Sequence, residues 1–186
     1  MLFRSPVLHR GPVPKDFYFA SEDLPDDANL SGLIAFHFAC YGAGTPKLDD
    51  YAHKSGVRDA IAPHAFVSAL ARRQLSLPKG GALAVVGHVE RAWTYSFTSA
   101  DAGDDLTMFE GALEALMLGG RLGAAMDYFA DKYAAVTATL NGALEDERFG
   151  AARNDALLAG LWTANNDARS YVIVGDPAVR LAVGSN

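Results

Sequence analysis

The chain has 186 residues, half of them hydrophobic and 20% charged, which is enough to bury the core of one domain. Its 16 basic and 22 acidic side chains give a net charge of −6, which opposes the attraction that drives most nucleic-acid binding. One cysteine can form neither an internal disulfide nor a thiolate zinc cluster, and the five histidines are scattered, so we expect no metal and no cofactor.

The amino-terminal region is irregular in composition. Residues 1–5 lack the apolar core of a signal peptide, prolines follow at positions 6, 12 and 14, and no apolar run approaches the ~18 residues of a membrane span. We therefore expect a cytoplasmic protein that does not enter a membrane. Residues 1–15 are expected to be irregular or non-native, and the abrupt start suggests a chain cut at its amino end.

A buried strand leading to the cysteine is the first clear element after a possible short strand at 16–20 and a polar turn at 21–27. Residues 32–40 form a short apolar run rich in aromatic side chains, which predicts a fully buried strand at the centre of a parallel sheet. The glycine-rich loop 41–44 follows, and its glycines should leave room for a substrate backbone. The carboxyl ends of parallel strands are where such sheets place ligands and chemistry. Cys40 is therefore a candidate nucleophile, although a free cysteine is also often a small buried hydrophobe.

A βαβ unit is predicted next. A loop runs from residue 47 to Pro63, a helix over 64–77 presents Phe66, Val67, Leu70 and Leu75 on one face, and a second buried strand covers 82–87. A right-handed crossover makes the two strands parallel, so Cys40 and His88 should emerge at the same edge of the sheet.

The remainder is mainly helical. We predict an aromatic-lined continuation over 89–99, a loop over 100–105, helices over 106–118, 122–144 and 154–162, and a last strand over 171–174. With no repeats and no clear linker, the fold class is α/β: one three-layer domain with a mostly parallel central sheet flanked by helices.

Three segments together resemble the caspase-like cysteine peptidase superfamily, and most closely its gingipain-like and CHAT-domain branches. They are residues 34–42, 80–89 and 171–177, and the resemblance spans roughly 16–181. It implies a caspase-like fold in which Cys40 is the nucleophile and 80–89 is the strand that helps form the pocket for the residue before the scissile bond.

The chain departs from the family pattern at the general base. The resemblance requires a strand ending in His-Gly before the cysteine strand, and no His-Gly pair occurs here. His9 is the only upstream histidine, and it lies in a proline-broken stretch. His37 should face away from Cys40 as a core histidine, and His53 and His64 should be solvated. We therefore interpret residues 1–186 as the carboxyl-terminal part of such a domain, whose histidine lies in a missing segment.

The other candidate residues surround the same sheet edge, and each has a purely structural alternative. Backbone N–H groups of the loop that contains Tyr41, Gly42 and Gly44 could stabilise an oxyanion, or the loop could be a plain turn. Candidate pocket residues are Asp49, Asp50, His88 and Glu90. The acids would favour a basic substrate side chain if they line the pocket, and otherwise they are solvated loop charges.

The predicted function is that of a cysteine endopeptidase-type domain that acts on a polypeptide by thiol acyl transfer and is inactive as this fragment. The main alternative is a non-catalytic caspase-like scaffold that binds a protein partner. A nucleotide-binding domain is a weaker alternative, because neither glycine-rich segment has the lysine and hydroxyl residues of a phosphate loop.

Overall fold

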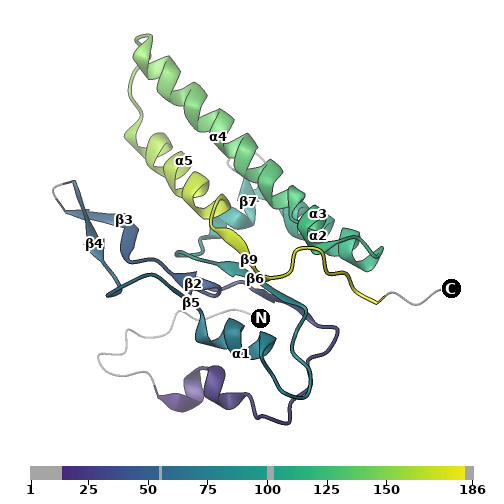
Figure 1. The fold of residues 1–186 in the computed structure, drawn as a ribbon. Coiled ribbons are helices and arrows are strands. Elements are labelled where there is room, and N and C mark those ends of the chain that lie inside the picture. The colour runs from purple at the N-terminus through teal and green to yellow at the C-terminus, as the bar shows by residue number, and fades with distance from the viewer. Residues whose placement is uncertain (1–13, 55, 100–102, 183–186) are drawn as a thin grey trace.

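The computed structural model describes residues 14–54, 56–99 and 103–182, and it shows a mixed α/β fold (Figure 1). The strands are β1 (Ile34–His37), β2 (Gly44–Thr45), β3 (Leu48–Lys54), β4 (Val57–Ala60), β5 (Phe66–Val67), β6 (Ala84–His88), β7 (Thr98–Ser99), β8 (Gly103–Asp104) and β9 (Tyr171–Gly175). The α-helices are α1 (Ala69–Leu75), α2 (Thr107–Met117), α3 (Leu122–Ala125), α4 (Asp127–Arg148) and α5 (Asp155–Ala168), and short 3-10 helices are η1 (Lys15–Phe17), η2 (Ser21–Asp23) and η3 (Thr94–Ser96).

The main sheet has the strand order β1-β6-β9. β1 pairs with β6 in parallel, which confirms the predicted crossover, with Ile34 opposite Ala84 and His37 opposite Gly87. β6 pairs with β9 in the antiparallel sense. The other paired strands, β2 with β5, β3 with β4 and β7 with β8, are also antiparallel. The expectation of a mostly parallel sheet is therefore not confirmed.

The direction of β9 follows from where α5 ends. α4 and α5 form a pair of helices that rises from the sheet and returns to it (Figure 1). The Val89 N–H donates to the Ser170 carbonyl at 2.9 Å, so the chain re-enters the sheet beside the carboxyl end of β6. From that point β9 can only run back along β6, which makes the pair antiparallel.

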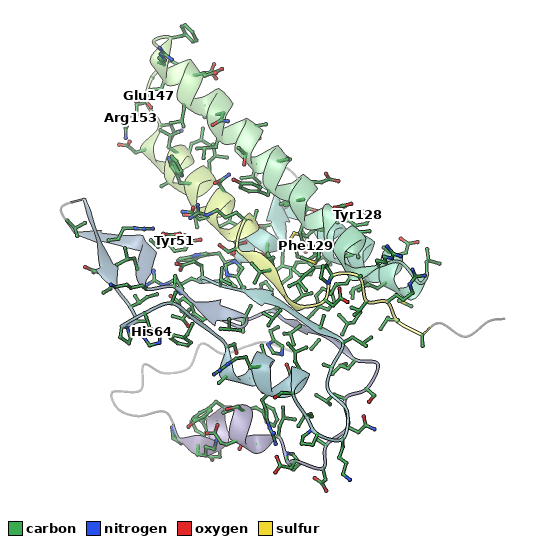
Figure 2. All side chains as sticks on the ribbon, viewed as in Figure 1. Tyr51, His64, Tyr128, Phe129, Glu147 and Arg153 are labelled. Atoms are coloured by element: carbon green, nitrogen blue, oxygen red, sulfur yellow. The ribbon has the colours of Figure 1, made fainter. Side chains whose placement is uncertain are left out.

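The core lies between the main sheet and the helices that follow β6. All five residues of β6 are buried, and Ala84 and Val86 pack with helical side chains, among them Leu116 of α2 and Leu122 of α3. Phe129 points from α4 into this layer (Figure 2) and contacts Phe109 and Tyr171 with ring centroids 5.2 and 4.9 Å apart. α1 lies on the other side of the sheet in Figure 1.

Two parts of the fold differ from the sequence-based expectations. The predicted helix 64–77 is wrong in its first part, because Phe66 and Val67 form β5 and the side chain of Ser68 accepts the Ala71 N–H at the start of α1. The predicted loop 47–63 instead contains the β3–β4 hairpin. Its strands carry charged residues rather than the apolar alternation by which half-buried strands are recognised.

Smaller differences occur elsewhere. Residues 15–17 form η1 rather than part of a strand. The helix expected over 122–144 is divided into α3 and α4, and α5 extends to Ala168, beyond the expected end at residue 162. Of residues 1–15, which were expected to be irregular or non-native, residues 1–13 lie outside the described part of the chain and Lys15 begins η1. No helix in residues 14–54, 56–99 or 103–182 is long and apolar enough to cross a membrane.

A glycine in β6 controls how closely the segment after Cys40 approaches the sheet. A Cβ at Gly87 would lie 2.9 Å from the Ala43 nitrogen and 3.1 Å from the Ala43 Cβ. We expect Gly87→Ala to lower the free energy of unfolding by about 1–3 kcal/mol, as overpacking does. Urea denaturation followed by circular dichroism measures this change.

The matched control for this experiment is Gly142→Ala in α4. A Cβ at Gly142 meets nothing within 4 Å, so alanine should be neutral or stabilise the helix by up to about 1 kcal/mol. Equal effects of the two substitutions would contradict the steric role assigned to Gly87.

Candidate functional site

Cys40 lies three residues beyond the end of β1 and is exposed. Its Sγ is 3.8 Å from the Ala92 carbonyl oxygen, and the Tyr41 N–H donates to the Glu90 carbonyl at 2.9 Å. The turn that carries the thiol is therefore held beside the chain that leaves β6. The expectation that Cys40 and His88 lie at the same end of the sheet is confirmed, because both follow the carboxyl-terminal direction of the parallel strands β1 and β6. However, β1 is an outer strand of the described sheet and β6 is the central one.

The N–H groups of this turn are mostly engaged within the protein. The Tyr41, Gly42 and Ala43 N–H groups donate to the carbonyls of Glu90, Ala39 and His88, at 2.9, 3.0 and 3.0 Å. A tetrahedral oxyanion could use these donors only if the turn rearranged. The Cys40 N–H has no acceptor among the described residues, so it is the donor in this turn that an oxyanion could use without displacing a protein carbonyl.

The glycines after Cys40 make room for the protein's own chain. A Cβ at Gly44 would lie 2.7 Å from the Phe66 carbonyl oxygen, and one at Gly42 would lie 2.9 Å from the His37 Cβ. Gly44 therefore permits the β2–β5 pairing, and Gly42 permits the turn to fold back over β1. The interpretation of these glycines as space for a substrate backbone is therefore not supported, because the protein's own chain fills that space.

Tyr41 has a left-handed backbone, with φ of +59°. For a residue other than glycine this conformation costs of order 1–3 kcal/mol, and such strain often lies at functional sites. The hydrogen bonds on either side of Tyr41 hold it in place. Burial raises the pKa of its hydroxyl, and the neighbouring Arg91 partly offsets this effect.

A hollow of about 600 Å³ adjoins the cysteine turn. It is lined by the chain neighbours Phe38, Ala39 and Gly42, by His37, and by residues at the start of α1. His37 Nδ1 lies 3.2 Å from the Gly42 carbonyl oxygen, so the Nδ1–H tautomer can donate to it. The hollow borders the turn that carries Cys40, so part of a ligand could lie in it.

His88 is completely buried, and its side chain belongs to a hydrogen-bond network. Its Nε2 lies 3.0 Å from the Asp167 carbonyl and 3.3 Å from Asp167 Oδ1, and its Nδ1 lies 2.9 Å from the Glu90 carbonyl. Asp167 also accepts from Ser96 Oγ at 2.5 Å and from the Trp93 N–H at 2.8 Å. His88 therefore has a structural position rather than a place in a substrate pocket.

The charge state of His88 follows from these contacts. Burial lowers its pKa, but the Asp167 carboxylate and the carbonyls of Glu90 and Asp167 outweigh that effect, so the pKa is raised above its ordinary value. The protonated ring can donate from Nε2 to Asp167 and from Nδ1 to the Glu90 carbonyl, and Asp167 compensates its charge. In the neutral Nε2–H tautomer, Nδ1 instead accepts the Glu90 N–H at 3.1 Å. The same network includes Tyr171, whose hydroxyl lies 2.7 Å from Ser96 Oγ. Burial raises the pKa of Tyr171.

Asp49 and Asp50 lie on β3 and are paired with arginines. Asp49 is buried, forms an ion pair with Arg91 and accepts the Tyr51 N–H at 2.8 Å. Asp50 pairs with both Arg58 and Arg169. The interpretation of these acids as charges that await a basic substrate side chain is therefore not supported. They fasten the β3–β4 hairpin to the chain after β6 and to the end of α5.

Glu90 is the least satisfied polar group near Cys40. It is 3% exposed, and its Oε1 has no hydrogen-bond partner among the described residues, whereas Oε2 accepts the Arg91 N–H at 3.3 Å. Burial, together with the carboxylates of Asp50 and Asp49, raises the pKa of Glu90. The ionised form of Glu90 is therefore the least stabilised charge in the cluster that supports the cysteine turn.

The three histidines with described side chains lie in different parts of the fold: His37 in β1, His64 before β5 and His88 in β6. His64 precedes β5, on the opposite side of the sheet from α4, whereas Tyr51 of β3 lies nearer α5 (Figure 2). Among the described side chains, no hydrogen bond joins His37, His64 or His88 to Cys40 Sγ. The predictions for His9 and for the side chain of His53 lie outside what the structure describes.

The residues that sequence reasoning missed are Asp167, Ser96 and Arg91. Asp167 lies beyond residue 162, the predicted end of the last helix, and Ser96 and Arg91 belong to no recognisable pattern of spacing. Comparison with known proteins adds no further assignment: no family model matches this chain, and no curated protein or solved structure is significantly similar to it.

The His88–Asp167 pair predicts a pH-dependent stability. Folding raises the pKa of His88, so its charge stabilises the folded state fully below the unfolded-state pKa of about 6.5. This stabilisation is lost as the pH rises through the higher folded-state pKa. We expect Asp167→Asn to lower the free energy of unfolding by about 3–5 kcal/mol while His88 is charged, and by less once it is neutral. Urea denaturation at successive pH values above 6 measures this difference.

The control for the pair is Ser96→Ala, which removes a hydroxyl from the same network without removing a charge. Its cost should be nearly independent of pH over the same range. If the Asp167→Asn cost is equally independent of pH, the charged pair proposed for the folded state does not exist.

Removing the charge of Glu90, unlike that of Asp167, is expected to stabilise the protein. Since its pKa is raised in the folded state, its ionisation destabilises the protein as pH rises from the unfolded-state value through the folded-state value. Glu90→Gln, which has the same shape, should therefore raise the midpoint of urea unfolding at pH 7–8 and give no gain near pH 4 relative to the unchanged chain. A loss of stability at pH 8 would show that the Glu90 carboxylate is favourably bound.

Proposed function

We propose that this chain is part of a cysteine endopeptidase-type domain with a caspase-like fold, in which Cys40 is the nucleophile. The observation that carries the proposal is the position of Cys40: an exposed thiol, just beyond the carboxyl end of a strand parallel to its neighbour, beside a hollow of about 600 Å³. The strained backbone at Tyr41 supports it, because strain of this kind is concentrated at functional sites.

The general base would come from outside the described residues. Thiol attack requires an imidazole that takes or holds the proton, but His88 is occupied by Asp167 and Glu90. In the described sheet, the outer edge of β1 has no paired strand. The resemblance implies a parallel strand at this position that ends in His-Gly. Its histidine would lie at the carboxyl end of the sheet, where Cys40 also lies.

The reaction would be acyl transfer in two steps. Cys40 Sγ attacks the peptide carbonyl carbon, its proton passes to the imidazole, and the tetrahedral oxyanion accepts a hydrogen bond from the Cys40 N–H. The C–N bond then breaks, and the leaving amine takes the proton from the imidazolium. Water, deprotonated by the same imidazole, attacks the thioester carbonyl and releases the carboxylic acid with the thiol restored.

A non-catalytic scaffold that binds a protein partner is the second candidate. The observation that favours it is that three N–H groups of the cysteine turn donate to protein carbonyls. A turn that is closed in this way has fewer donors for a transition state. In this alternative Cys40 is a small exposed residue and the hollow beside it receives part of the partner.

Labelling of Cys40 distinguishes the two candidates. Cys40 is the only cysteine, so uptake of a fluorescent iodoacetamide reports this thiol alone. We expect slow labelling and no peptide hydrolysis by residues 1–186. Adding the natural upstream sequence with a His-Gly strand should accelerate labelling at neutral pH and permit hydrolysis, with a gain of about 10²–10⁴-fold over a variant lacking that histidine.

Cys40→Ala and Cys40→Ser are the controls, and both should abolish hydrolysis without changing the circular dichroism spectrum. Hydrolysis that survives Cys40→Ala would exclude Cys40 as the nucleophile. An extended protein that remains inert, with Cys40 still slow to react, would favour the scaffold.

A further inference from the structure

A hollow of about 420 Å³ is lined by residues of α4, the end of α5 and β9. Phe129 and Tyr133 line it from α4, and Tyr171 and Ile173 line it from β9. Phe129 is labelled in Figure 2, where it points from α4 toward the sheet. The volume lies at the lower end of the range of pockets that bind small molecules. Residues 40–44 of the cysteine turn are not among the described residues that line it, so this hollow is separate from the candidate site at Cys40.

Three of the residues that line this hollow carry aromatic rings. Phe129 and Tyr171 contact each other, with ring centroids 4.9 Å apart and ring planes inclined at 57°, and Tyr133 follows Phe129 by one turn of α4. Phe129 is buried, so its ring is fixed by the core. The Tyr171 hydroxyl is engaged with Ser96 Oγ at 2.7 Å. Contacts between aromatic rings contribute beyond the area that they bury. The hollow therefore favours a ligand with an aromatic body.

Arg169 is the one charged side chain among the described residues that line the hollow. It follows the last residue of α5, and 44% of its side chain is exposed. Its Nη2 donates to Asp50, whereas Nε and Nη1 have no acceptor among the described residues. Asp50 also pairs with Arg58, so one carboxylate serves two guanidinium groups. Arg169 can therefore bind a second carboxylate, whose two oxygens match the fork of a guanidinium group.

We propose that this hollow binds a small aromatic carboxylic acid, with the carboxylate on Arg169 and the ring against Phe129, Tyr133 and Tyr171. The net charge of −6 opposes non-specific binding of anions, so preference for an acid comes from the local charge of Arg169. A neutral ligand of the same shape leaves that charge unpaired. An acid with an aliphatic body lacks the contacts between rings. The proposal does not depend on peptidase activity at Cys40.

Titration calorimetry with three probes tests the chemistry of the site. Sodium 4-phenylbutyrate has the proposed carboxylate and ring, 4-phenylbutanamide has the same ring without the charge, and octanoate has the charge without the ring. We expect 4-phenylbutyrate to bind one site per chain with a dissociation constant below about 1 mM, as its size permits. The amide should bind at least about tenfold more weakly, because it lacks the charged hydrogen bonds. Octanoate should also bind more weakly than 4-phenylbutyrate.

Arg169→Gln tests the residue that holds the carboxylate. It should weaken binding of 4-phenylbutyrate to the level of the amide, at least about tenfold. The matched control is Arg58→Gln, which removes the other arginine that pairs with Asp50. Arg58 has a similar exposed fraction, 45%, and does not line the hollow. This control should leave the preference for the acid unchanged.

Ala130→Phe tests the place of binding independently of charge. Ala130 is an exposed residue of α4 that lines the hollow, so a phenylalanine there should fill it and block both the acid and the amide. Ala135→Phe, at an exposed position of α4 outside the hollow, should leave binding unchanged. Circular dichroism checks that each variant folds, and if Arg169→Gln does not fold, the two alanine variants decide.

Four outcomes would overturn the proposal. They are no saturable binding of 4-phenylbutyrate up to several millimolar, equal affinities for the acid and the amide, tighter binding of octanoate, and binding that survives Ala130→Phe. An equal loss of affinity in Arg58→Gln and Arg169→Gln would also overturn it, because the carboxylate would then respond to the surface charge in general rather than to Arg169.

Discussion

The buried contact between His88 and Asp167 is the constraint on which the rest of the arrangement depends. It joins the carboxyl end of β6 to the last turn of α5, two segments 79 residues apart. The imidazole is completely buried, and an ion pair of this kind is stable only because further hydrogen bonds satisfy both partners. Ser96, Trp93 and the carbonyl of Glu90 supply them.

This contact fixes the position of the cysteine turn indirectly. The Glu90 carbonyl lies next to His88 Nδ1 and also accepts the Tyr41 N–H, and the His88 carbonyl accepts the Ala43 N–H. The segment after β6 therefore lies between the core helices on one side and the turn that carries Cys40 on the other.

The sequence allowed a good prediction of the elements that have a strong apolar pattern. β1, β6, α2 and β9 lie close to their expected places, and the parallel pairing of β1 with β6 follows from the short crossover. The direction of β9 was not predictable, since it depends on where α5 ends. The β3–β4 hairpin was missed because its stability comes from arginine pairs with Asp49 and Asp50 rather than from an apolar face.

The candidate site was predictable only in part, for a related reason. Cys40 was found because a strand pattern leads to it, and its exposure agrees with a reactive position. The roles of the surrounding charges depend on pairings between distant residues, such as Arg91 with Asp49 and Arg169 with Asp50, that no local pattern indicates. Asp49 and Asp50, two of the acids that suggested a basic substrate, are engaged in these pairs.

The proposed function concerns one outer edge of the three-stranded sheet. An open edge exposes unpaired N–H and C=O groups, so natural sheets cover it or protect it with charges. β1 contains no Asp, Glu, Lys or Arg, so its edge has no such protection among the described residues. The strand proposed beside β1 would cover this edge and complete a catalytic site at Cys40.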